Sequence, residues 1–294
     1  MFSNIVIGYD GSPQSHDAVA LARLLRDPAH GAVTAVNAYP VQATWFDAPG
    51  AGMYLDSLRE QAEETLGEVR ELLEGVPVRV RAVPDPSPAR VLTAVAEDED
   101  ADLIVIGSTR HAPLGRILMG STAPRVLHGA PCAVAVAPAG LAAEPRVPQR
   151  IAVAYDGSPE ARAALDRAVA LATELGASIE LLGASGPHPV VAAGPGLPAF
   201  DPNLEEAIER GTRETLERAA AEVPSAIAVS TRLLVGSPVH VIAEAAADFG
   251  LLVTGSRSYG PLRRVLLGST TSGLMHECPV PLLVTPRSAL TDAG

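Results

Sequence analysis

The amino-acid sequence contains an internal duplication. Residues 8–13 read Gly-Tyr-Asp-Gly-Ser-Pro, and residues 154–159 read Ala-Tyr-Asp-Gly-Ser-Pro. The triplet Gly-Ser-Thr at 120–122 returns at 268–270, and further matching segments keep their order and spacing almost without gaps. A repeat this long indicates a duplicated domain and not the short period of a solenoid.

The chain of 294 residues gives each copy about 145, a normal size for a domain with its own core. We expect domains at 1–140 and 150–294, with 139–149 as the linker. No run of about 18 apolar residues is present, and the first residues follow a strand pattern and not that of a signal peptide, which predicts a soluble, cytoplasmic protein. Cys132 and Cys278 occupy non-equivalent positions of the repeat without C-x-x-C spacing, so we expect both to be reduced and packed, with no metal.

The charge of the chain narrows the classes of partner and of chemistry. The net charge of −12 argues against nucleic acid or an anionic membrane, because such surfaces need clustered positive charge. Every basic residue is arginine, so a Walker A lysine, a Schiff-base lysine and a lysine general base are all excluded. A bound phosphate would have to be held by backbone N–H groups, hydroxyls or arginine.

Apolar segments alternate with amphipathic ones along each copy, which predicts parallel sheets covered by helices on both faces. The sequence therefore predicts an α/β chain with two tandem doubly wound, Rossmann-like domains. In the first copy we expect strands at 4–9, 32–38, 76–83, 102–107 and 132–137, and helices at 13–26, 54–73, 89–97 and 121–127.

The remaining segments carry further expectations. The acidic run 97–100 reads as a solvated loop, and the Pro/Gly-bearing segments 42–53 and 186–202 are candidate lids or contact surfaces. Each copy ends in an apolar strand. Because sheet edges need to be covered, we expect the halves to pack through these last strands around a pseudo-two-fold axis, as a dimer within the chain. A homodimer of the whole chain stays open.

Asp10 and Asp156 directly follow the first strand of each copy. Ligands of open parallel sheets bind beyond the carboxyl ends of the strands, so either carboxylate could accept a hydrogen bond from a ribose hydroxyl or an adenine amino group. The alternative is that the aspartate stabilises the Gly-Ser-Pro turn as an Asx residue.

A glycine-bearing loop follows the fourth strand of each copy and ends in Gly-Ser-Thr at a predicted helix start. Glycine allows close approach of the backbone to a phosphate, and free N–H groups with the helix dipole favour an anion. The alternative is an ordinary capped helix, since serine and threonine are favoured caps without any ligand. The two loops begin at Gly107 and Gly255.

These motifs resemble the universal stress protein family in its tandem two-domain form, with a fold similar to the nucleotide-binding α-hydrolase-like domains. The resemblance covers essentially the whole chain. In the nucleotide-binding branch of that family, a Gly-x2-Gly-x9-Gly-Ser/Thr loop wraps the phosphates and ribose of ATP. The spacing is kept in both copies, but the middle glycine is replaced by Arg110 and Ser258.

The resemblance implies a nucleotide site in each copy, with adenine near Ala38 or Ala184. The implied site residues are Gly8, Asp10, Ala38, Gly107, Gly120, Ser121 and Thr122 in the first copy, and Asp156, Ala184, Gly255, Arg257, Gly260, Gly268, Ser269 and Thr270 in the second. The second copy has Gly260 at the position where the first copy has Ala112, so we expect the second copy to be the better site. The first copy, however, keeps Gly8 where the second has Ala154.

Three classes of function then compete. The first is a nucleotide-responsive stress regulator that binds ATP, with or without Mg²⁺, and is not an enzyme. The second is an interaction scaffold of the same family without nucleotide binding, which the missing middle glycines favour. The third, an adenylyl-transferring or ATP-hydrolysing enzyme, lacks a paired acid and base and has a single aspartate per half for Mg²⁺, although slow ATP turnover stays open.

Overall fold

A computed structural model describes residues 1–41, 51–109, 114–118, 120, 122–186, 202–256 and 268–286. The elements of the first half are β1 (Asn4–Gly8), α1 (Pro13–Leu25), β2 (Ala32–Tyr39), α2 (Ala51–Leu72), β3 (Val78–Pro84), α3 (Pro88–Asp98), β4 (Leu103–Gly107), α4 (Thr122–Gly129) and β5 (Ala133–Ala137). After the short 3₁₀ turn η2 (Leu141–Ala143), the second half has β6 (Arg150–Ala154), α5 (Pro159–Leu175), β7 (Ser178–Ser185), α6 (Pro202–Ala221), β8 (Val229–Val235), α7 (Pro238–Ala246), β9 (Leu251–Gly255), α8 (Ser269–Glu277) and β10 (Leu282–Thr285).

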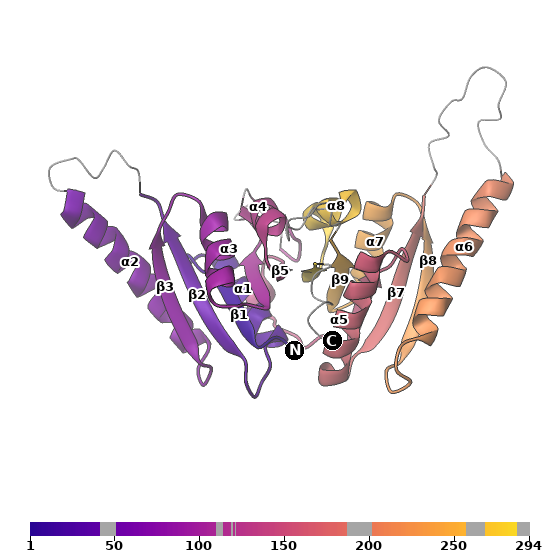
Figure 1. Ribbon diagram of the computed structural model, residues 1–294, viewed down its shortest axis with the longest axis horizontal. Helices are drawn as coiled ribbons and strands as arrows, with labels where there is room; N and C mark the ends of the chain where they lie inside the picture. Colours follow the sequence, from indigo (N-terminus) through magenta and orange to yellow (C-terminus); the bar gives the residue numbers. More distant parts are fainter. Residues whose placement is uncertain are drawn as a thin grey trace, which may run out of the picture.

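Within the described residues the strands form one sheet of ten, in the order β3-β2-β1-β4-β5-β10-β9-β6-β7-β8. Neighbouring strands are parallel except β5 and β10, which pair antiparallel with Leu283 opposite Ala135. The last strands of the two copies therefore join the halves, as expected from their apolar sequences (Figure 1). Within each half the strand order reverses beside β1 or β6, which confirms the doubly wound α/β fold.

The continuous apolar strands are explained by two buried layers, one on each face of the sheet. Ile5 and Ile7 of β1 face the layer under α1, α2, α5 and α6. Val6 faces the layer under α3, α4, α7 and α8. Because both faces are covered, no residue of such a strand needs to be polar, and the two-residue alternation of a half-exposed strand is missing.

The first helix of each half begins as the sequence predicts. The Ser12 hydroxyl accepts a hydrogen bond from the N–H of Ser15 at 3.3 Å, and the Ser158 hydroxyl accepts one from Ala161 at 3.1 Å. Each serine is followed by a proline in the first turn, whose missing N–H costs nothing there. The glycine before each serine has φ of +74° or +81°, a conformation that favours glycine.

The linker contains a turn that the sequence did not predict. Asp17 of α1 is 2 % exposed, and its carboxylate accepts the N–H groups of Gly140 at 2.9 Å and Ala142 at 2.8 Å. These bonds cap η2 and hold the start of the linker against α1. In the sequence, Asp17 is a single acidic residue of an amphipathic helix, where a solvent-facing position is the usual expectation.

The acidic run 97–100 is solvated as expected at Glu97, Asp98 and Asp100, but it is only partly a loop, because α3 extends to Asp98. The partly buried Glu99 carboxylate lies 2.7 Å from the guanidinium of Arg79 and 3.3 Å from that of Arg81. Both arginines stand on β3, an edge strand. The cysteines, by contrast, are free and buried, as predicted.

Two loop predictions have a mixed outcome. Helix α2 begins at Ala51, three residues before the predicted start, while residues 42–50 and 187–201 of the candidate lids lie outside the described residues. No described helix combines the length and the apolar character that a membrane span requires.

Candidate functional site

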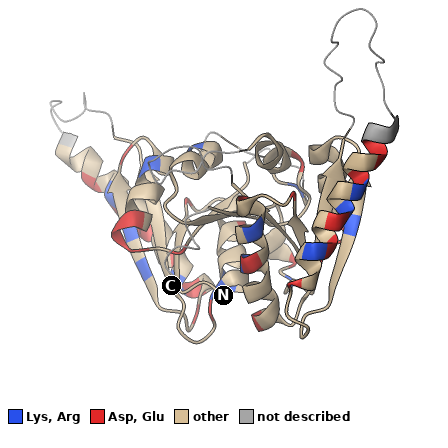
Figure 2. Cartoon of the chain, turned by 45° about the vertical axis from the view of Figure 1, so that its right-hand side comes forward, with Lys and Arg blue, Asp and Glu red and all other residues tan. Residues whose placement is uncertain are grey.

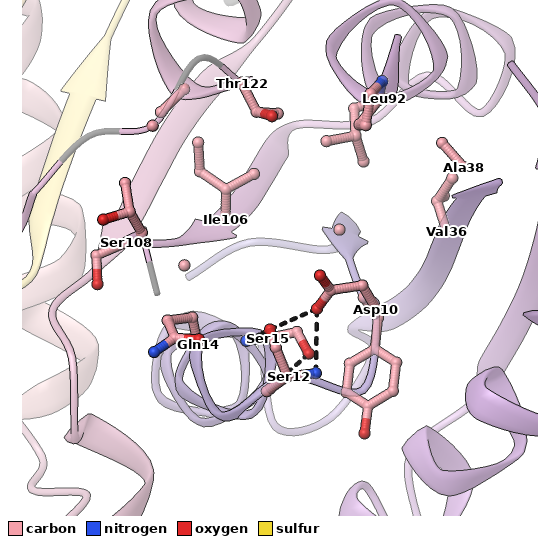
Figure 3. A pocket seen from close by; sticks show the side chains of 17 residues that line it. Asp10, Ser12, Gln14, Ser15, Val36, Ala38, Leu92, Ile106, Ser108 and Thr122 are labelled. Atoms are coloured by element: carbon pink, nitrogen blue, oxygen red, sulfur yellow. Dashed lines mark hydrogen bonds between the residues drawn. The ribbon is translucent and has the colours of Figure 1, made fainter. Parts of the chain in front are cut away.

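A cavity of about 460 Å³ lies in the first half at the carboxyl ends of β1 and β4. This is the switch point of the strand order, where open α/β sheets bind ligands, and the volume is typical of small-molecule sites. The lining residues come from both strand ends, β2 and the first turns of three helices (Figure 3): Gly8, Tyr9, Asp10, Ser12, Gln14, Ser15, Val36, Ala38, Pro88, Leu92, Ile106, Gly107, Ser108, Thr109, Gly120, Thr122 and Ala123.

The cavity has an apolar side and a polar side. Val36, Ala38 and Leu92 lie together on one side, and Ser108 lies on the other, with Asp10 between them (Figure 3). A flat apolar ring and a polar chain joined by a sugar would find matching surfaces in this order. The structure thus brings together Gly8, Asp10, Ala38, Gly107, Gly120 and Thr122, six of the residues that the resemblance implied for the first copy.

Asp10 forms the Asx turn that the sequence left open as an alternative. Its Oδ1 accepts the N–H of Ser12 at 3.1 Å and also contacts the Ser12 hydroxyl. In the second half, Asp156 accepts the N–H of Ser158 at 3.0 Å in the same way. The carboxylate therefore stabilises the turn in both halves, and in the first half it does so while lining the cavity.

Gly107 and Gly255 are required by packing, a cause that the sequence did not reveal. A Cβ atom on Gly107 would lie 2.0 Å from the carbonyl oxygen of Gln14, and one on Gly255 would lie 2.4 Å from that of Glu160. The first turn of α1 or α5 is thus pressed against the end of β4 or β9. These glycines were interpreted as making room for a phosphate, but helix packing alone already demands them.

The helices after the glycine loops begin near the predicted positions. Thr122 starts α4, and Ser269 starts α8, whose N-cap is Gly268. Serine and threonine therefore stand inside the first turn of α8 and not at its cap, contrary to the ordinary capped-helix interpretation. The first N–H groups of a helix have no partner within it, and Thr122 and Ala123 present this end of α4 to the cavity.

Sequence reasoning missed Ser108, which directly follows β4. Its side chain is 9 % exposed, and its hydroxyl has no hydrogen-bond partner among the described residues. Ser256, the matching residue after β9, is 1 % exposed, and its hydroxyl likewise has no hydrogen-bond partner among the described residues. A buried hydroxyl without a partner is costly, which distinguishes this position in the structure. In the sequence, the available signal was the recurrence of serine directly after Gly107 and Gly255.

Tyr9 closes the side of the cavity beneath Asp10. Its hydroxyl donates to the Glu68 carboxylate at 2.7 Å and lies 3.1 Å from Nε2 of His16. Burial and the hydrogen bond to Glu68 raise the pKa of Tyr9 above its ordinary value, so the phenol stays protonated at neutral pH. Tyr9 is therefore a fixed part of the wall and not a base.

Several predicted residues cannot be placed in a described site. Ser121, Arg257 and Gly260 lie outside the described residues, as do Arg110 and Ser258. In the second half, the loop 257–267 likewise lies outside the described residues. The remaining predicted residues belong to that half: Asp156, Ala184, Gly255, Gly268, Ser269 and Thr270. The prediction that the second copy is the better site stays a prediction.

The two halves match the same known domain. A profile of the universal stress protein family fits residues 1–138 and again residues 148–286. The chain belongs to the universal stress protein family. Its two family domains follow each other in one polypeptide, which is the tandem form that the repeated motifs indicated.

Relatives of similar length align with almost the whole chain. The chain is 28 % identical over 300 residues to a universal stress protein of Mycolicibacterium smegmatis, with 96 % of this chain and 97 % of the relative aligned. It is 29 % identical over 300 residues to one of Mycobacterium tuberculosis, covering 97 % of each. The crystal structure of a universal stress protein from Archaeoglobus fulgidus matches 97 % of this chain and 98 % of its own with a TM-score of 0.70 at 21 % identity, which shows the shared fold.

Proposed function

We propose that this universal stress protein binds an adenine nucleotide in the cavity of its first half and acts as a nucleotide-responsive stress regulator. The observation that carries the proposal is the composition of that cavity, in which an apolar side, a carboxylate and the start of α4 follow one another. Adenine would pack against Val36, Ala38 and Leu92, a ribose hydroxyl would donate to Asp10, and phosphates would lie at the start of α4.

The polar side supports a phosphate without lysine. The Ser108 hydroxyl lacks a described partner, and the N–H groups at Thr122 and Ala123 belong to the first turn of α4. Hydroxyl and N–H donors suit the oxygens of a phosphate group. The resemblance to the nucleotide-binding branch of the family selects ATP among the adenine nucleotides.

The chemistry of the cavity favours binding over catalysis. Among the described lining residues, Asp10 is the single carboxylate, and Tyr9 stays protonated. Within the described part of the chain, no three histidine, cysteine or acidic residues gather to hold a metal ion. Family membership agrees with a stress-response protein.

The direct test is calorimetric titration of the full chain with ATP, ADP and adenosine, together with mass spectrometry of small molecules released from freshly purified protein. Gly120→Val is directed at the first site, and Gly268→Val with Ser269→Ala at the second. Each change should weaken ATP binding at its own site at least tenfold, since one or two charge-assisted hydrogen bonds of about 1.5–3 kcal/mol each are lost. His128→Ala, on the exposed last turn of α4, is the control and should leave affinity unchanged.

The alternative is an interaction scaffold without nucleotide. Met53 and Tyr54, near the start of α2, are 82 % and 51 % exposed, which is unusual for large apolar side chains and suits a protein contact. If no adenine nucleotide binds and none is released from the purified protein, the scaffold replaces the regulator as the better proposal.

A further inference from the structure

Part of the loop between Gly107 and Gly120 is attached to the other half of the molecule. The N–H of Ile117 donates to the carbonyl oxygen of Cys278 at 2.9 Å, and Cys278 follows the last turn of α8. The Ile117 side chain is completely buried, in the same apolar layer as Leu274 and Met275 of α8. Figure 1 shows α4 of the first half and α8 of the second half on either side of the place where the two halves meet.

The same segment is tied to the cavity. The carbonyl of Leu118, next to Ile117, accepts the N–H of Thr109 at 2.8 Å. Thr109 lines the cavity, and so does Gly120, whose added Cβ would lie 3.0 Å from the Thr109 methyl group. The position of this polar wall therefore depends on where Ile117 is held.

Besides the bond from Thr109, the first half holds the segment at its other end. Gly115 and Arg116 exchange backbone hydrogen bonds with Ala139, at 2.8 Å and 3.1 Å. Ile117 lies between these two first-half attachments, and its N–H is bonded to the second half. Since the packed interior does not deform smoothly, loss of the Ile117 contact should displace the wall as a unit.

We propose that the second half positions the phosphate side of the first half's cavity, with Ile117 as the positioning residue and the Cys278 carbonyl as its anchor. The inference rests on the proposed function, because it names how that site is completed. It makes the cavity a product of both repeats, although its described lining residues belong to the first.

The test is carried out on the full chain carrying Gly268→Val and Ser269→Ala, so that the first site is titrated alone, with ADP and adenosine as the probes. Ile117→Ala should lower the affinity for ADP at least tenfold and leave that for adenosine within about twofold, because the loop contacts phosphate and not the base. Ile117→Val should restore most of the loss. Ile179→Ala in β7 is the matched control: it removes an equally buried isoleucine, and ADP affinity should not change.

A substitution in the second half provides an independent test of the inference. Met275→Ala changes no residue of the first half, yet it should weaken ADP binding at the first site and speed hydrogen exchange at the Ile117 amide. Unchanged ADP affinity in folded Ile117→Ala and Met275→Ala would overturn the inference. Equal losses for ADP and adenosine would also overturn it, since they indicate general destabilisation. If the parent chain binds neither probe, the proposed function fails first, and this inference falls with it.

Discussion

The two halves agree closely at the carboxyl ends of their strands and differ at the other end. Both have the Asx turn, the serine cap and the glycine packed against the first helix. Near the amino end of β4, Arg81 pairs with Glu99. In the second half, Arg232 pairs with Asp248, just after α7, at 3.8 Å and also with Glu180 of β7 at 2.6 Å, and its guanidinium carbon lies 5.9 Å from the ring centroid of Phe249.

In both halves the arginine of the outer strand pairs with an acidic residue near the end of α3 or α7, and the second half adds a partner on the neighbouring strand. Such partly exposed ion pairs contribute little to stability, so their partners can vary between the halves. The turn at the cavity has no such freedom, because the aspartate, glycine and serine each make a separate backbone contact. Figure 2 shows that both signs of charge spread along the outer helix α6, which fits a tolerant surface.

The largest effect should come from the packed glycines. Gly107→Ala and Gly255→Ala should each lower the free energy of unfolding by about 3 kcal/mol, because the new methyl group would meet a backbone carbonyl. Gly67→Ala and Gly211→Ala, in open positions of α2 and α6, are the controls and should raise stability by about 0.5–1 kcal/mol. Chemical denaturation measures all four, and a mild effect at only one of the two packed glycines would break the likeness of the halves.

A second prediction concerns a difference between the halves. Asp17→Ala should cost about 2 kcal/mol, since two N–H groups of the linker turn lose their acceptor. Asp17→Asn keeps one acceptor oxygen and should cost less. The second half has Ala163 at the matching position and therefore no carboxylate for such a contact. Denaturation curves for the two variants measure the contact, and an equal cost for Asp17→Ala and Asp17→Asn would show that the remaining amide oxygen does not serve as an acceptor.

The sequence predicted the features that recur in both halves and missed those that occur in one half only. The parallel sheet, the serine caps and the joining of the halves by their last strands follow from local patterns that are written twice. The Asp17 contact and the Glu99 pairs do not, because each joins residues far apart in the chain and occurs in one half only.

The candidate site was predicted in position but not fully in cause. Asp10 was placed at the cavity correctly, whereas the packing role of Gly107 needed the distance to Gln14, which no sequence pattern reports. Ser108 was missed because serine after a strand is common, and only its burial without a described partner distinguishes it.

A smaller, pH-specific effect should come from the cysteines. Burial raises the pKa of Cys278 to about 12, and burial with the nearby Asp102 charge does the same for Cys132. The unfolded chain then releases these protons first, so stability is complete below about pH 9 and falls as the pH rises towards 12. At pH 10 each thiol should account for about 1 kcal/mol of loss.

The cysteine variants separate the two contributions. Cys132→Ala and Cys278→Ala should each flatten the decline between pH 9 and pH 11, and the pair should flatten it most. Comparison with the same variants at pH 7 corrects for lost packing. If the slope of the unfolding free energy against pH is the same in all variants, the thiols are not its source. Any decline left above pH 10 would then belong to other groups, Tyr9 among them.

The smallest effect on stability is expected at the residues most exposed to a ligand. Asp10→Asn and Asp156→Asn should change the free energy of unfolding by no more than about 0.5 kcal/mol, because the amide oxygen can still accept the serine N–H of the turn. Asp10→Ala removes that acceptor and should cost about 1 kcal/mol.

The effect of these aspartates on binding should be larger. Asp10→Asn should weaken adenine nucleotide affinity about five- to tenfold, since a carboxylate accepts a stronger hydrogen bond from ribose or an amino group than an amide does. Thermal unfolding and calorimetry on the same samples compare both quantities. A large loss of stability with unchanged affinity would mean that these aspartates serve the turn alone, in both halves.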